Sequence, residues 1–162
     1  MRIAMLLIGL AVLCICTGAA LADPSSPDAK EEWESTWEMT GYRSIVPESE
    51  PNNPCPTSQT VFLGDIVDPA AISPAGDLDY YAIYLLTTDR LTVLTDRATG
   101  CTPAIDTKVY IYRDDCTTQL GYDDDGGPGL YSYIAGSAWT PPYDGTYYVK
   151  VQHYSATGTG CY

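Results

Sequence analysis

The sequence predicts an all-β protein, an antiparallel β-sandwich with an N-terminal extension. Short runs rich in Tyr, Val, Ile and Thr recur through residues 48–162, and clusters of Gly, Pro and Asp separate them. No convincing helical pattern lies between these runs, so the strands are expected to pack on one another as two sheets. The expected strands are 60–67, 80–86, 90–96, 107–113, 119–122, 130–135 and 146–153.

Residues 1–22 are typical of a secretory signal peptide. Arg2 gives the positive start, residues 3–16 form an apolar run, and Ala-Leu-Ala at 20–22 is a small-residue cleavage site. The apolar run is too short to span a bilayer comfortably. We therefore expect a secreted, extracellular protein with no membrane attachment after the signal is cleaved.

The chain is strongly acidic. It has 21 Asp and Glu against eight Lys and Arg, a net charge of −13, and one of the basic residues, Arg2, would leave with the signal. A surface of this charge repels phosphate backbones and attracts cations. Nucleic acid is therefore not expected as a partner, whereas a metal ion is.

Residues 23–47 form an acidic extension that lacks a clear hydrophobic face apart from Trp33, Trp37 and Met39. Two local structures remain open. A helix starting at Ser-Pro-Asp, 26–28, would place the two indoles on one face. A strand over "WESTWEMT" would place both indoles and Met39 on one side, and Glu and Thr side chains on the other. In both cases the extension has an apolar edge that it cannot bury by itself.

The cysteines predict two disulfides within one chain. Removal of residues 1–22 leaves Cys55, Cys101, Cys116 and Cys161, an even number in a secreted chain, and the sequence allows three pairings. We favour Cys101 with Cys116, closing an excursion between neighbouring strands, and Cys55 with Cys161, joining the two ends of the domain. Zinc is not expected, since there is no C-x-x-C pair and one histidine, His153.

Four motifs occur in a fixed order along residues 48–162: "EPNN", "GDLDYYAIYL", "YDDDGG" and "DGTYYVKVQHY". This order resembles the bacterial pre-peptidase C-terminal (PPC) domain, and it is similar to the collagen-binding domains of clostridial collagenases. The resemblance implies a jelly-roll-like β-sandwich that is not itself catalytic. It also implies calcium, which some members bind between the segment that begins the domain and the loop before the Asp-x-Asp strand.

Carried over to this chain, the resemblance implies a calcium site formed by Glu48, Glu50, Asn52, Asn53, Asp77 and Asp79. The chemistry agrees, because Ca²⁺ takes six to eight oxygen ligands from carboxylates, amides and carbonyls. Without a cation, so many carboxylates in one place would repel one another. The alternative is that these residues form only a turn and a solvated loop. The second acidic stretch, "YDDDGGPG" at 122–129, is predicted to be a solvated hairpin turn.

No motif for catalysis is present. The chain has no G-x-S-x-G, no H-E-x-x-H and no phosphate-binding glycine loop, and its single histidine is expected at a strand end. We therefore predict that the protein is not an enzyme.

The favoured function is an extracellular structural subunit that self-associates head to tail into a filament or matrix. In the resembling family the last strand continues beyond the glycine-rich turn, whereas "GTGCY" ends at Tyr162. We expect residues 32–40 of a neighbouring chain to complete the sandwich, with Trp33, Trp37 and Met39 in its core. The alternative is an accessory binding module that presents some of its 14 tyrosines to an extracellular protein or polysaccharide.

Overall fold

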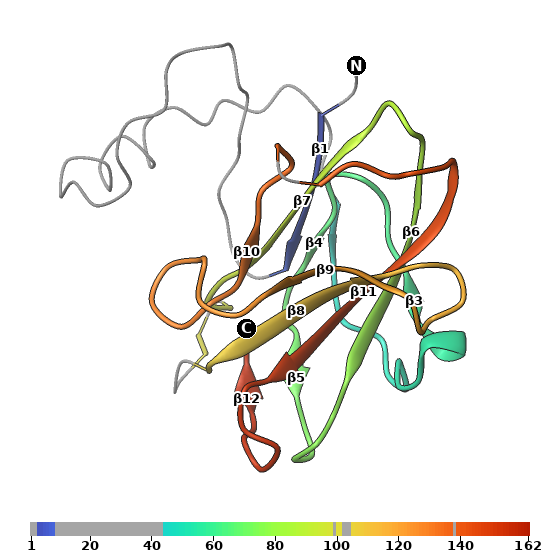
Figure 1. Cartoon of the computed structure of the whole chain (residues 1–162). Helices are drawn as coiled ribbons and strands as arrows, with labels where there is room; N and C mark the ends of the chain where they lie inside the picture. Colours follow the sequence, from blue (N-terminus) through green and yellow to red (C-terminus); the bar gives the residue numbers. More distant parts are fainter. Residues whose placement is uncertain (1–2, 9–43, 99, 102–104, 138) are drawn as a thin grey trace, which may run out of the picture. The chain divides into compact units, whose positions relative to one another are not determined.

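The computed structural model describes residues 3–8, 44–98, 100–101, 105–137 and 139–162, and it confirms the all-β prediction. Two five-stranded sheets, here sheets A and B, and one two-stranded ribbon contain the strands (Figure 1). Over the described residues, the only helical element is one 3₁₀ turn, η1 (Cys55–Thr57). Most of the predicted extension, including Trp33, Trp37 and Met39, lies outside the described residues.

Sheet B has the order β3-β6-β11-β8-β9, and its neighbours are antiparallel apart from the parallel pair β3 and β6. Its strands are β3 (Gln59–Thr60), β6 (Asp79–Leu85), β11 (Gly145–His153), β8 (Thr107–Tyr112) and β9 (Gln119–Asp123). Side chains alternate between the two faces of a strand. This alternation buries Tyr147, Val149 and Val151 of β11 completely.

Sheet A has the order β10-β7-β1-β4-β2. Its strands are β10 (Tyr133–Ile134), β7 (Arg90–Thr95), β1 (Ile3–Ile8), β4 (Ile66–Val67) and β2 (Ile45–Val46). The sheet is mixed, because β1 runs parallel to both of its neighbours and β2 runs parallel to β4, whereas β10 and β7 are antiparallel. Two of these strands lie outside the predicted domain 48–162: β1 within the predicted signal peptide and β2 within the predicted extension.

The ribbon joins β5 (Ala71–Ile72) to β12 (Gly160–Cys161) in antiparallel register. The amide of Tyr162 extends this pairing by donating to the carbonyl of Ala70 at 3.0 Å. Tyr162 is fully buried. The ribbon therefore brings an aromatic hydroxyl from the end of the sequence into the interior, beside β6.

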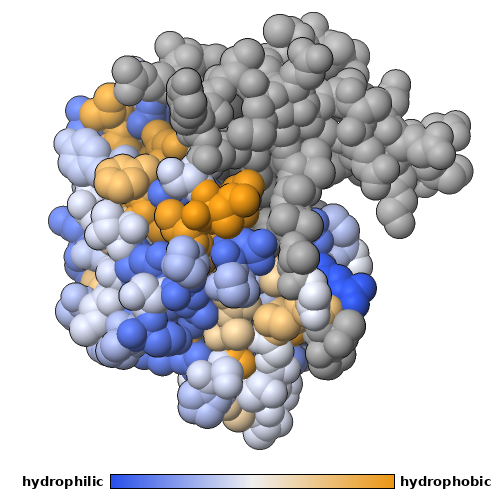
Figure 2. Space-filling model, turned by 180° about the vertical axis from the view of Figure 1, so that it is seen from behind, coloured by the Kyte–Doolittle hydropathy of each residue, from blue (hydrophilic) through white to orange (hydrophobic). Residues whose placement is uncertain are grey.

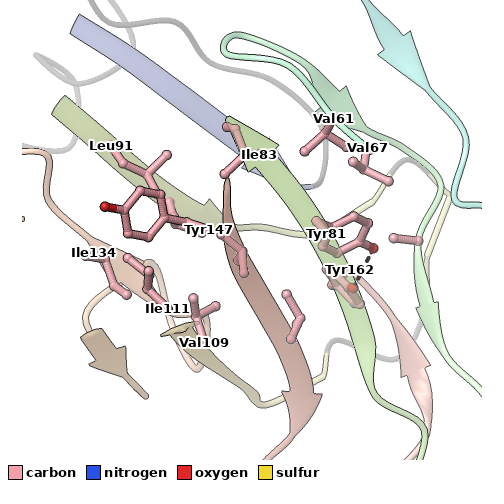
Figure 3. Packing of buried hydrophobic residues seen from close by; sticks show 14 of the residues in the cluster. Val61, Val67, Tyr81, Ile83, Leu91, Val109, Ile111, Ile134, Tyr147 and Tyr162 are labelled. Carbon is pink, nitrogen blue, oxygen red and sulfur yellow. Dashed lines mark hydrogen bonds between the residues drawn. The ribbon is translucent and has the colours of Figure 1, made fainter. Parts of the chain in front are cut away.

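The core lies between the sheets and draws on both (Figure 3). Leu91 and Val93 of β7 and Ile83 of β6 are at most 1% exposed. Full burial of an aliphatic side chain of this size stabilises the folded state by about 1.5–3 kcal/mol. Trp139 packs edge-on against Tyr147 with ring centroids 5.3 Å apart, a favourable geometry for an aromatic pair.

One predicted strand, 60–67, is interrupted. A turn separates β3 from β4: the amide of Asp65 donates to the carbonyl of Phe62, and the Asp65 carboxylate accepts from the Phe62 amide. Gly64 adopts a φ of 92°, which glycine tolerates without strain. Phe62 is consequently 72% exposed. The apolar composition of "TVFLGDIV" predicted a continuous strand. The Gly-Asp pair within it is the sequence signal for the observed turn.

The structure forms two disulfides within the chain, but with a different pairing from the predicted one. Cys55 bonds to Cys116 and Cys101 to Cys161, with Cα atoms 6.1 Å and 5.8 Å apart. Cys101 with Cys116 was the wrong choice because β8 runs between them, and a six-residue strand spans roughly 20 Å. Disulfide geometry requires Cα atoms within about 7 Å of each other. Cys55 is then left for Cys116, across the end of sheet B.

Several large hydrophobic side chains are exposed on the surface of the described residues. Seen from behind, Figure 2 shows a group of hydrophobic residues with more polar surface below it. Ile45, on the edge strand β2 of sheet A, is 63% exposed. No helix within the described residues has the length and apolar character needed to cross a membrane.

Candidate metal centre

The segment 48–53 is held as a loop between β2 and η1. Pro47, Pro51 and Pro54 lack an amide hydrogen and cannot continue a strand ladder. The segment is fixed instead by local bonds: the Glu48 amide donates to the carbonyl of Pro69 at 3.1 Å, and the Asn52 amide donates to Glu50 Oε2 at 2.7 Å. The side chains of this loop are therefore positioned before any ligand binds.

β6 delivers the second part of the site. Asp79 is the first residue of β6 and has the same parity as Tyr81, Ile83 and Leu85, all of which face the core. Its carboxylate is therefore buried, with 0% of the residue exposed. Asp77, two residues earlier, lies in the preceding loop and is 5% exposed.

The fold brings together Glu48, Glu50, Asn52 and Asp79, here called the acidic cluster. One carboxylate oxygen from each of Glu48, Glu50 and Asp79 lies within 4.8 Å of the others. Asn52 Nδ2 donates to Glu48 Oε1 at 3.2 Å, which places the amide beside the carboxylates. Four of the six predicted ligands thus lie at one place, although they come from two separate stretches of sequence.

Hydrogen-bond donors surround part of the acidic cluster. The Ala71 amide donates to Glu48 Oε2 at 2.8 Å, and the Tyr81 hydroxyl donates to Glu48 Oε1 at 2.9 Å. The Tyr162 hydroxyl donates to Asp79 Oδ2 at 2.5 Å and lies 3.0 Å from the Tyr81 hydroxyl (Figure 3). Burial raises the pKa of both tyrosines well above the usual value, so both hydroxyls keep their protons.

Two oxygen atoms of the acidic cluster are left without a hydrogen-bond partner. Asn52 Oδ1 and Asp79 Oδ1 are buried and accept no hydrogen bond, and both residues are 0% exposed. A buried polar atom without a partner costs about 1–3 kcal/mol, more when the group is charged. An additional positively charged group at this place would remove that cost.

Among the described residues, no basic side chain forms an ion pair with these carboxylates. The only ion pair in the described part of the chain joins Arg113 to Asp114 on the surface. Burial, followed by the negative charge of Glu48, raises the pKa of Asp79 from 3.8 to about 9. Burial likewise raises the pKa of Glu48. In the absence of a metal ion, a bound proton therefore neutralises part of the charge.

The donor set meets the requirements of a hard divalent cation. It offers three carboxylates and one amide oxygen, two of whose atoms have no other partner. Ca²⁺ accepts such ligands in irregular geometry, whereas Mg²⁺ demands a strict octahedron. Zn²⁺ prefers Cys and His ligands. His153 is not part of this group, and the four described cysteines are in disulfides.

Asn53 and Asp77, the other two predicted ligands, bond to each other beside the acidic cluster. Asn53 Nδ2 donates to Asp77 Oδ1, and Asn53 Oδ1 accepts from the Leu78 amide at 2.7 Å. Asp77 Oδ2 accepts from the Ser73 amide at 2.8 Å. The pair therefore ties the segment 48–53 to the loop before β6, and its side-chain oxygens already have partners.

A second acidic group arises where the sequence predicts only a turn. Asp123 forms that turn by accepting from the amides of Gly126 and Tyr133, each at 2.8 Å. Asp124 and Asp125, however, meet Asp106, which comes from the segment before β8. Asp106 Oδ1 and Asp124 Oδ1 are buried without a hydrogen-bond partner, but none of the three residues is fully buried, so the group is a second and more exposed candidate for a cation.

Sequence reasoning missed Tyr81 and Tyr162 as parts of the site. Tyr81 was accessible to prediction, since it lies two residues after Asp79 and shares its face of β6. Tyr162 carried no such signal, because its position depends on the pairing of β12 with β5.

His153 lies at the end of β11, where its Nδ1 accepts from the Ser155 amide at 2.9 Å. The histidine thus lies at a strand end, where the sequence predicts it, and forms a local hydrogen bond there.

Comparison of the chain with protein-family models gave no match, and comparison with curated proteins gave none either. The resemblance to PPC domains therefore remains a prediction from sequence motifs. The fold and the acidic cluster define a class: an all-β, disulfide-bonded protein with a group of oxygen ligands that could hold a metal ion.

The charge of the acidic cluster predicts a pH dependence. In calcium-free protein, Asp79 keeps its proton up to pH about 9, whereas in the unfolded chain it loses it near pH 3.8. The folded state therefore binds more protons within this window, and its stability decreases as pH rises from about 4 to about 9. Thermal melts in chelator should show this decrease, and saturating calcium should reduce it. A calcium-free protein that gains stability across the window would contradict the assignment.

Proposed function

We propose that this protein is a secreted, non-catalytic, calcium-binding β-sandwich that serves as a structural, self-assembling subunit outside the cell. The observation that supports it most directly is the acidic cluster with its two unpartnered, buried oxygen atoms, Asn52 Oδ1 and Asp79 Oδ1. An extracellular protein encounters calcium at concentrations that weak sites of this kind can use.

The calcium ion would be held by Glu48, Glu50, Asp79 and Asn52, with Asn53 and Asp77 bracing the loops behind them. It would supply positive charge between carboxylates from two separate segments. Because only Pro47 separates Glu48 from β2, the ion would also hold in place the strand that follows the extension. The proposed site thus connects metal binding to the segment that is predicted to mediate assembly.

The disulfides fit a protein that works outside the cell. Cys55–Cys116 and Cys101–Cys161 close loops with sequence separations of 61 and 60. Such bonds persist in oxidising compartments and are rare in the cytosol. Together with the predicted signal peptide, they support secretion.

A binding module for an extracellular protein or polysaccharide is the second candidate, and one surface feature favours it. On sheet B, Tyr80, Lys150, Tyr110 and Tyr122 form one row across four strands. Aromatic rows of this type can stack against flat ligands. Lys150 Nζ already lies 3.9 Å from the centre of the Tyr110 ring. Because this cation occupies part of the row, we rank the binding role second.

Electron microscopy of the secreted protein with and without calcium tests the proposed function. We expect ordered assemblies in millimolar calcium and fewer or shorter ones after chelation. Isothermal titration calorimetry on the same sample should detect a calcium-binding event. A protein that binds calcium but stays monomeric at all concentrations would support the binding module instead. If the protein neither binds calcium nor assembles, the proposed function is wrong.

A further inference from the structure

β1 occupies an unusual place, in the middle of sheet A. It pairs with β7 over six residues, from Ile3 opposite Arg90 to Ile8 opposite Thr95. On its other side, Leu7 and Ile8 pair with Ile66 and Val67 of β4. β1 also belongs to the same compact unit as the sandwich. The strand position between β4 and β7 is here called the β1 lane.

The sequence predicts that residues 1–22, and β1 with them, are removed on secretion. In the described residues, β4 and β7 do not pair with each other, and β1 is the only link between them in sheet A. Two strand spacings separate them, roughly 9.6 Å, which is beyond hydrogen-bonding distance. Cleavage would therefore leave the β1 lane empty, with unpaired backbone groups on both sides.

The strands on the two sides of the lane have contacts that do not involve β1. At the end of β7, Thr95 Oγ1 lies 2.7 Å from Thr107 Oγ1, and Thr92 Oγ1 accepts from the Gly136 amide at 2.8 Å. On the other side, the Asp68 amide donates to the carbonyl of Val46 at 3.0 Å. Each side of the lane therefore keeps these other partners when β1 is gone.

An empty lane would also open the core. Leu91 and Val93 of β7 and Val67 of β4 are all 0% exposed while β1 is in place. These residues belong to the main core cluster. Unpaired strand edges beside exposed apolar surface attract another strand. The lane thus requires an occupant of about six residues, with apolar side chains at alternate positions on its inner face.

We infer that the β1 lane receives residues 32–40 of a second copy of this chain, an inference that rests on the proposed secretion and self-assembly. The stretch "EWESTWEMT" is long enough for the lane and alternates as a strand with one buried face requires. Trp33, Trp37 and Met39 would share the inner face. Glu and Thr side chains would point outward.

The short connection to β2 favours a neighbouring chain as the donor. Residues 41–44 join this stretch to β2, and β4 lies between β2 and the lane. A donor parallel to β4, as β1 is, would need a crossover of a dozen or more residues to reach β2 of its own chain. Donation to a neighbour has no such limit, and head-to-tail donation repeats into a filament.

The donor face can be tested in the secreted protein. Trp33→Ser with Trp37→Ser changes only the apolar face of the donor, and Thr36→Ser with Thr40→Ser is the matched control on its polar face. Size is followed by light scattering in calcium. We expect polymers for the wild type and the control, and monomers for the Trp variant. A chain of the Trp variant still has an empty β1 lane, but it cannot donate residues 32–40 to a neighbour and therefore ends a polymer. An equal mixture of variant and wild type should thus give polymers at least twofold shorter.

The outcomes separate this inference from the proposed function. Mass spectrometry must first show that residues 1–22 are absent, because a retained leader would fill the lane and overturn the inference. Polymers of wild-type length from the Trp variant would also overturn it, although assembly by another contact would stand. A monomeric wild type would overturn both strand donation and assembly, whereas a calcium-induced rise in melting temperature would still support the metal site. If calcium raises the melting temperature of the Trp variant as much as that of the wild type, the variant is folded. Its loss of assembly then does not result from unfolding.

Discussion

Calcium should raise the melting temperature of this protein by roughly 10 °C, and Asp79→Asn should abolish most of that rise. An ion that binds only the folded state stabilises it by about 2.7 kcal/mol when its free concentration is a hundred times the dissociation constant. For a domain of this size, that free energy corresponds to a shift of about ten degrees. Asp79 is the central residue to change, because its buried Oδ1 has no other partner. Differential scanning calorimetry in millimolar calcium and in chelator measures the shift.

The control for this prediction is Asp114→Asn, which removes the same charge from an exposed carboxylate that pairs with Arg113. It should leave the calcium-induced shift unchanged. In chelator, Asp79→Asn should melt no lower than the wild type at pH 8, since it removes a buried carboxylate whose pKa is raised to about 9. An equal calcium shift in wild type and Asp79→Asn would contradict the site.

The long strands could be predicted because alternation reveals them. β6, β8 and β11 each contain at least six residues, and their buried positions follow a period of two. β2, β4, β5 and β12 have two residues each, and two residues carry no period. Their places depend on pairing with distant partners. β1 could not be predicted for another reason. It belongs to a continuously apolar leader, and such a leader has the composition of a signal peptide whether or not it also pairs in a sheet.

The candidate site could be predicted in part, for a related reason. Glu48, Glu50 and Asn52 lie close in sequence, so a local concentration of oxygen ligands is visible without a fold. Asp77 and Asp79 have the same parity, so only the start of β6 distinguishes the strand residue Asp79 from the loop residue Asp77. Asp106 beside Asp124 and Asp125 could not be foreseen, because β8 and β9 lie between them in sequence.

The disulfide pairing shows how a predicted strand can constrain a separate prediction. The expected strand 107–113 already placed Cys101 before it and Cys116 after it. A direct bond between the two would have required the short segments on either side of the strand to span its whole length. The length of that strand therefore argued against Cys101 with Cys116, but it left the other two pairings open.

Removal of the Cys101–Cys161 bond should cost about 4 kcal/mol of folding stability. The bond closes a loop with a sequence separation of 60, and the chain-entropy model gives about 4 kcal/mol for a loop of this length. Both cysteines change to Ala together, since Cys101 is only 3% exposed and a serine hydroxyl there would be buried. Chemical denaturation measures the loss. Cys55→Ala with Cys116→Ala should cost a similar amount, because its loop has a separation of 61.

Thiol counting on the same variants tests the pairing itself. If Cys101 bonds to Cys161, the folded Cys55→Ala, Cys116→Ala variant keeps one intact disulfide and has no free thiol. With the initially favoured pairing, the same substitutions would break both bonds and leave two free thiols. The Cys101–Cys161 bond also lies next to Tyr162, whose hydroxyl donates to Asp79 at 2.5 Å. Its removal should therefore weaken calcium binding as well, seen as a smaller calcium-induced rise in melting temperature, because the end of β12 would no longer hold this donor in place.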